Sequence, residues 1–201
     1  MRMRIAQLAA RLMAEDGIDD YGLAKRKAAR QAGAPDTRNL PDNSEVEEAL
    51  RAYQQLYQAD EQASRLRFLR ERAKELLKLL ARFDPHLTGS VLSGSAGRYS
   101  GVDVHLFAES PKDVELFLIN QGMPFKAREF RFSVGGEARS IPGYELEFKG
   151  ADVRLSVFGV DDIRLSIRSG ADGRVIERVR LEWVERSLLS DPGDHATKLP
   201  A

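Results

Sequence analysis

The sequence predicts an α+β fold in which an N-terminal helical region precedes a mixed sheet with helices on one face. Two observations support this prediction. Apolar residues recur at helical spacing through most of residues 2–83, whereas short alternating segments separated by glycine and proline follow from residue 84. A helix that comes after two strands and before a run of further strands is typical of an α+β sheet.

Composition limits the class of protein. The 201 residues suit one domain with an extension or two small domains, and 42% hydrophobic residues can form a core. Lys plus Arg and Asp plus Glu both number 31, so the net charge gives no argument for a polyanionic partner. The absence of cysteine excludes disulfides, thiolate metal sites and cysteine nucleophiles. No apolar run could span a bilayer or serve as a signal peptide, so we expect a cytoplasmic protein without a membrane partner.

Residues 1–43 are predicted to form a helical pair and a linker. The first helix, over 2–16, carries its apolar residues on one face and stops at Gly17. The second helix is expected over 20–32, and residues 34–43 are rich in turn-forming residues.

This opening resembles the start of TetR-type repressors, where a helix-turn-helix binds DNA. Such a motif would need a recognition helix directly after Gly33. The sequence Ala-Pro-Asp-Thr-Arg-Asn-Leu-Pro follows instead, so DNA is the least favoured partner. The basic residues Lys25, Arg26 and Lys27 are more simply the solvated face of a helix.

Residues 44–83 are predicted to form a long connecting helix or two helices. Ser44 with Glu47 matches a capping box. The apolar stripe slips at residues 58–65, which indicates either one helix with a stutter or two helices that meet there. A single helix would be about 55–60 Å long. Such a helix would pack against the N-terminal pair or against a second copy of the chain.

Residues 84–189 are predicted to form the sheet domain, and 190–201 a disordered tail. A helix is expected from Ser110-Pro111, because a capping residue followed by proline is a helix start. A last helix is expected over 175–189. The predicted strands cover 91–93, 102–107, 125–134, 144–149, 151–158 and 163–168.

The centre of the chain combines a Gly-Ser pair with an acidic strand. Val91-Leu92-Ser93 precedes Gly94-Ser95, and Ser100-Gly101-Val102-Asp103-Val104 follows. This arrangement resembles the nucleotidyltransferase superfamily, which includes polymerase beta and the minimal nucleotidyltransferases. In that family a strand ends in Gly-Ser, and the next strand carries two aspartates separated by one hydrophobic residue. The resemblance covers Leu66 to Phe158.

The resemblance implies transfer of NMP from an NTP to an acceptor, with Mg²⁺ as the cofactor. Two carboxylates at i and i+2 of a strand share a face, and with a third they can hold two Mg²⁺ ions. Asp103 and Asp152 are the candidate catalytic residues and metal ligands, with Glu147 as the alternative to Asp152. The candidate nucleotide-binding residues around the turn are Gly94, Ser95, Arg98 and Ser100.

The chain departs from the family pattern at three points. Gly101 stands where the first aspartate belongs, the turn from Ser95 to Ser100 is short, and the third carboxylate is not obvious. His105 shares a face with Asp103 and is a further candidate metal ligand, although imidazole suits zinc or manganese better than Mg²⁺. The alternative for His105 is a strand residue that makes a hydrogen bond. The second hypothesis for function is therefore a catalytically inactive nucleotide- or protein-binding module of the same fold.

Overall fold

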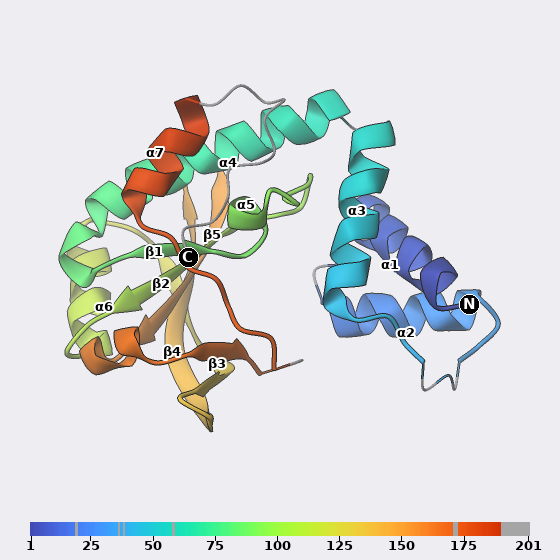
Figure 1. Ribbon diagram of the computed structural model, residues 1–201. Coiled ribbons are helices and arrows are strands. Elements are labelled where there is room, and N and C mark those ends of the chain that lie inside the picture. Colours follow the sequence, from blue (N-terminus) through green and yellow to red (C-terminus); the bar gives the residue numbers. More distant parts are fainter. Residues whose placement is uncertain (19, 36, 38, 58, 171–172, 190–201) are drawn as a thin grey trace. The chain divides into compact units, whose positions relative to one another are not determined.

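A computed structural model describes residues 1–189 except 19, 36, 38, 58, 171 and 172 (Figure 1). Seven α-helices and a six-stranded mixed sheet lie in this part of the chain, so the predicted α+β class is confirmed. The chain divides into a helical unit, Met1–Leu66 with Ser95–Ser100, and a sheet unit, Arg67–Gly94 with Gly101–Ala201. This division does not coincide with the predicted boundaries after residues 43 and 83.

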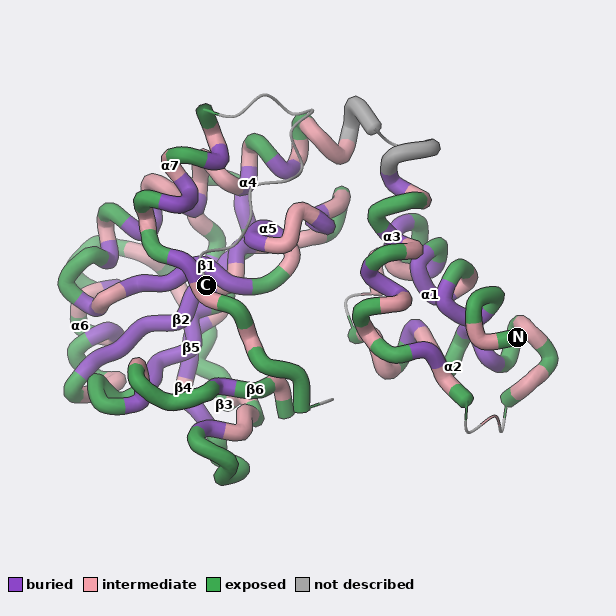
Figure 2. The backbone as a smooth tube through the Cα atoms, viewed as in Figure 1, coloured by how far each residue is buried: buried purple, intermediate pink, exposed green. Residues whose placement is uncertain are grey.

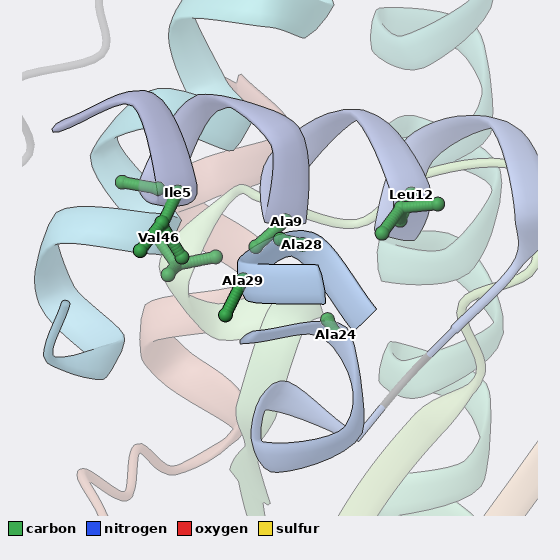
Figure 3. Packing of buried hydrophobic residues seen from close by; sticks show 8 residues of the cluster. Ile5, Ala9, Leu12, Ala24, Ala28, Ala29 and Val46 are labelled. Carbon is green, nitrogen blue, oxygen red and sulfur yellow. The ribbon is translucent and has the colours of Figure 1, made fainter. Parts of the chain in front are cut away.

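The helical unit contains α1 (Arg2–Asp16), α2 (Tyr21–Gln31), α3 (Asn43–Tyr57) and the start of α4 (Ala59–Leu79). The two predicted N-terminal helices are thus confirmed. The question of one helix or two over 44–83 turns on residue 58, which lies outside the described residues. Because α1 packs on α2 and α3 mainly through alanines, the helices approach closely. Figure 3 shows this core, which includes Ile5, Ala9, Leu12, Ala24, Ala28, Ala29 and Val46.

The start of α3 differs from the prediction. The Asp42 N–H donates to the Glu45 carboxylate at 2.7 Å, and the Glu45 N–H donates to Asp42 Oδ1 at 2.9 Å. This reciprocal pair is a capping box shifted two residues from the predicted Ser44 and Glu47. Glu47 is instead buried and accepts a hydrogen bond from Arg51.

The sheet unit is built on six strands in the order β1-β2-β5-β4-β3-β6. Strands β2 and β5 pair in parallel, and all the other pairs are antiparallel. The strands are β1 (His86–Thr88), β2 (Val102–Phe107), β3 (Phe125–Val134), β4 (Glu137–Phe148), β5 (Ala151–Phe158) and β6 (Ile167–Ser169). The helices that accompany them are the rest of α4, α5 (Gly89–Ser93), α6 (Pro111–Asn120) and α7 (Leu181–Leu189), with 3-10 turns at Ala81–Phe83 and Val160–Arg164.

Several predicted elements need correction. Residues 91–93 belong to helix α5 and do not form a strand. The chain turns at Gly89, and Val91 and Leu92 are buried as residues of this helix. Strand β4 begins at Glu137 and not at the predicted residue 144, and it continues through Pro142-Gly143. Residues 175–180 are not helical; the segment pairs with strands instead, through bridges from Val179 to Leu87 and from Val175 to Arg168.

The two faces of the sheet have different environments. Tyr144 on β4 donates a hydrogen bond to the Pro111 carbonyl at 2.9 Å, so α6 covers the face to which Tyr144 points. Leu155 lies opposite Tyr144 in the ladder and therefore shares that face. Arg154 and its partner Asp103 point to the other face, since successive residues of a strand alternate. Figure 2 shows that β2 and β5 are largely buried.

None of the helices in the described part of the chain combines the length and the apolarity that crossing a bilayer requires.

Candidate functional site

The Gly-Ser pair that follows a strand is not the predicted one. Strand β1 ends at Thr88, and Gly89-Ser90 follows it directly and opens α5. Gly94, in contrast, ends that helix, and its N–H donates to the Ser90 carbonyl at 3.0 Å. The segment between this Gly-Ser pair and Gly101 is thus residues 91–100. It is longer than the turn from Ser95 to Ser100, so the connection is not short when counted from Gly89-Ser90. The sequence contains two Gly-Ser pairs, Gly89-Ser90 and Gly94-Ser95. Only the position of β1, which the sequence does not predict, shows that Gly89-Ser90 is the pair that follows a strand.

Asp103 lies against this turn at Gly89. Gly89 has a φ of +71°, and a Cβ on it would stand 2.6 Å from Asp103 Oδ2. The backbone can therefore approach the carboxylate only because residue 89 is glycine. The Thr88 hydroxyl donates to the Asp103 carbonyl at 3.3 Å and ties β1 to β2.

The side chain opposite Asp103 is an arginine. Asp103 on β2 is in register with Arg154 on β5, and its Oδ1 lies 3.6 Å from Arg154 Nη1. The Asp103 side chain is 35% exposed and the Arg154 side chain 51% exposed. The carboxylate therefore faces a fixed cation that solvent can reach.

Gly101 cannot be replaced by the missing aspartate without a backbone shift. A Cβ at residue 101 would stand 2.6 Å from the Asp152 carbonyl oxygen and 3.3 Å from the Asp152 Cβ. Real side chains do not approach a backbone oxygen so closely, so the start of β2 and the start of β5 meet here only through a glycine. The departure from the family pattern at Gly101 is thus built into the sheet.

The residues around Asp103 do not fit the implied Mg²⁺ site. Asp152 is exposed and shares the face of Asp103, but it lies two residues before Arg154, the direct neighbour of Asp103. Mg²⁺ needs oxygen ligands, whereas the side chain in register with Asp103 on β5 is a guanidinium, 3.6 Å from its carboxylate. In the part of the chain that the structure describes, no group of three or more His, Asp or Glu side chains could hold a metal ion.

An aromatic ring and a second arginine lie on the same face of the sheet. The Arg154 guanidinium lies 5.4 Å from the centre of the half-buried Phe130 ring. Arg128, two residues before Phe130 on β3, donates from Nε to the Glu145 carboxylate at 3.0 Å. Asp103, Arg154, Phe130 and Arg128 therefore form a cluster that we call the Arg154 cluster. In the sequence, Arg128 and Arg131 alternate with Phe130 and Phe132, a pattern that fits contact with a nucleotide and fits a half-buried strand equally well. Arg154 carries no such signal.

His105 does not belong to this cluster. It is 3% exposed, and its ring lies 4.7 Å from the Phe158 ring and 5.5 Å from the Phe132 ring. Burial lowers the pKa of His105 to about 3, and the nearby Arg178 charge acts in the same direction. Its Nδ1 has no hydrogen-bond partner among the described residues. The surroundings of His105 are those of an aromatic core, and the predicted hydrogen bond is not made by Nδ1.

The predicted nucleotide-binding residues Ser95, Arg98 and Ser100 belong to the helical unit. Ser95 is buried, and its carbonyl accepts a hydrogen bond from Gln54 Nε2 at 3.2 Å. The Ser100 carbonyl accepts from Arg65 Nη2 at 3.1 Å, and its hydroxyl accepts from the Gly97 N–H at 3.0 Å. The loop 95–100 is thus held by side chains of α3 and α4.

The Arg98 side chain is exposed, with its guanidinium 5.7 Å from the Tyr99 ring. Of the predicted set, Gly94, Asp103 and Asp152 belong to the sheet unit, and Ser95, Arg98 and Ser100 belong to the helical unit.

The helical unit does not have the arrangement that a helix-turn-helix needs. Helix α2 ends at Gln31, and the next described helix begins only at Asn43. Two of the basic side chains of α2 have intramolecular partners: Lys27 lies 3.6 Å from Asp16, and Lys25 donates to the Asn43 side chain at 2.7 Å.

Comparison with known proteins adds no family assignment, because no protein-family model and no curated protein matches the chain.

Proposed function

We propose that the sheet unit is a nucleotidyltransferase-like module that binds a nucleotide without transferring its NMP group. The order of elements supports the nucleotidyltransferase-like part of the proposal. Strand β1 leads directly into the Gly89-Ser90 pair and the next strand, β2, carries Asp103, which agrees with the family pattern; helix α5 lies between the two strands. The fold by itself does not imply activity.

The observation on which the binding proposal rests is the Arg154 cluster. Asp103 faces Arg154 instead of a second carboxylate, and Gly101 leaves no room for one. A guanidinium binds phosphate oxygens well because its planar donors match them. The Phe130 ring lies 5.4 Å from that guanidinium, an arrangement in which ring and cation attract each other, so it helps to hold Arg154 in place.

Titration calorimetry with ATP, GTP, CTP and UTP tests the binding. We expect wild-type protein to bind at least one of them, and Phe130→Ala to weaken that binding up to about fivefold, because the variant loses the ring that supports Arg154. Leu116→Ala is the control, because Leu116 is an exposed apolar residue on α6, which covers the opposite face. Equal binding by wild type and Phe130→Ala would contradict the assigned position of the nucleotide.

The rival hypothesis is NMP transfer that uses Asp103. Labelled NTPs are incubated with Mg²⁺ or Mn²⁺ and candidate acceptors, with Asp103→Ala in parallel. We expect no transfer above that of the variant. Transfer by wild type that is lost in Asp103→Ala would overturn the binding-only proposal.

A further inference from the structure

We propose that the Arg154 guanidinium stands in for the divalent cation of this site, so that nucleotide phosphates bind beside Asp103 without metal. This inference rests on the proposed function and assigns the group that contacts the phosphates. It follows from four features of the Arg154 cluster: the geometry of the ion pair, the distribution of neighbouring carboxylates, the support of the guanidinium, and the close approach at Gly101.

The ion pair between Asp103 and Arg154 is open. Its 3.6 Å separation exceeds the roughly 2.7–2.9 Å of a charge-assisted hydrogen bond. The same unit contains a closed pair for comparison: Arg139 donates two hydrogen bonds to the buried Asp162, at 2.8 and 3.0 Å. Arg154 thus neutralises Asp103 through its charge, while its fork of donors is not engaged by that carboxylate in the bidentate manner of Arg139.

The carboxylate in register with Arg154 on β4 has its own arginine. Glu145 on β4 is in register with Arg154 and could compete for it. However, Arg128 donates to Glu145 at 3.0 Å. Arg128 therefore pairs with Glu145, and Arg154 is the arginine that faces Asp103.

The guanidinium is also supported and reachable. The Phe130 ring lies under it at 5.4 Å, an arrangement in which the ring and the cation attract each other. With half of its side chain exposed, Arg154 can meet a phosphate without leaving this position. A guanidinium held on a ring loses less conformational freedom when it binds.

A divalent cation would meet obstacles at the same place. Bound to Asp103, it would lie beside a fixed positive charge, and like charges oppose binding. The position that could supply another carboxylate on β2 is Gly101, where the Asp152 carbonyl leaves no room for a side chain. The positive charge that contacts the phosphates is therefore supplied by Arg154.

The test is calorimetry in EDTA and in excess Mg²⁺, using whichever of ATP, GTP, CTP and UTP binds best. Wild type should bind equally well in both buffers. Arg154→Ala should weaken binding in EDTA at least tenfold. Arg154→Lys keeps the charge but not the two-pronged guanidinium, so its affinity should lie between those of wild type and Arg154→Ala. Arg154→Asp should lose binding in EDTA and recover it with Mg²⁺. Arg131→Ala is the matched control, because this exposed arginine of β3 points to the opposite face from Phe130.

The outcomes separate this inference from the proposed function. Circular dichroism first shows whether Arg154→Ala is folded. If wild type binds only with Mg²⁺, or if folded Arg154→Ala binds as well as wild type, the role of Arg154 is overturned and nucleotide binding remains in place. No binding by wild type in either buffer overturns both.

Discussion

Lowering the pH from 6.5 to 5 should destabilise the sheet unit through His105. The buried imidazole contacts the Phe132 and Phe158 rings, and burial lowers its pKa from 6.5 to about 3. Between these two values the unfolded chain binds a proton that the folded protein does not bind. The free energy of unfolding therefore falls as the pH decreases through this range, and it is insensitive to His105 above it.

The size of the effect follows from the width of that range. One pH unit between the two pKa values changes the free energy of unfolding by about 1.4 kcal/mol for a single group. From pH 6.5 to pH 5 the loss due to His105 is therefore about 2 kcal/mol. The pKa of His86 is also lowered by burial, so this second histidine acts in the same direction.

Urea unfolding at pH 7 and pH 5, followed by tryptophan fluorescence, measures this loss. Trp183 is the sole tryptophan of the chain and is 7% exposed in the sheet unit, so its emission reports that unit. His105→Gln keeps a polar side chain that does not titrate. The stability lost between the two pH values should be about 2 kcal/mol smaller in the variant than in wild type. His86 contributes to both proteins and cancels.

If wild type and His105→Gln lost equal amounts of unfolding free energy between pH 7 and pH 5, this reasoning would be refuted. Equal losses would mean that His105 takes up a proton in the folded protein as readily as in the unfolded chain. The aromatic surroundings assigned to it would then be wrong, and a role as metal ligand would again be open.

Two further predictions concern stability. Gly101→Ala should lower the free energy of unfolding of the sheet unit by about 1–3 kcal/mol, as overpacking does, because the added Cβ would stand 2.6 Å from the Asp152 carbonyl oxygen. In urea unfolding, the control Gly159→Ala should change stability by less than about 1 kcal/mol, since its Cβ meets nothing nearer than 3.5 Å; equal effects would argue against the close approach at Gly101. Asp42→Ala should lower the melting temperature of the helical unit more than Ser44→Ala, because Asp42 accepts the Glu45 N–H. Circular dichroism at 222 nm follows this melting, and a larger effect of Ser44→Ala would restore the original assignment of the cap.

Local patterns predicted many elements well. Strand β3 has the predicted bounds 125–134, because alternation ends at a Gly-Gly turn. Helix α6 begins at Pro111 as expected, and the Ser110 hydroxyl caps it by accepting the Lys112 N–H. Both signals depend only on neighbouring residues, which is why the sequence was sufficient.

Patterns failed where a distant segment decides the local conformation. Val91 and Leu92 have the apolar character of a short strand, but the turn at Gly89 against Asp103 places them in a helix. Residues 175–180 have helical spacing, yet Val179 pairs with Leu87. A hydrogen-bonded partner from elsewhere in the chain outweighed local propensity in this segment.

The sequence by itself determined the α+β class, the position of Asp103 on a strand, and the absence of a carboxylate at Gly101. Which side chain faces Asp103 was decided only by the tertiary structure. That answer depends on the register between β2 and β5, two segments far apart in the chain, and a shift of one residue would turn Arg154 to the other face. The pairing of Asp103 with Arg154, and with it the metal-free site proposed here, is therefore a property of the folded sheet.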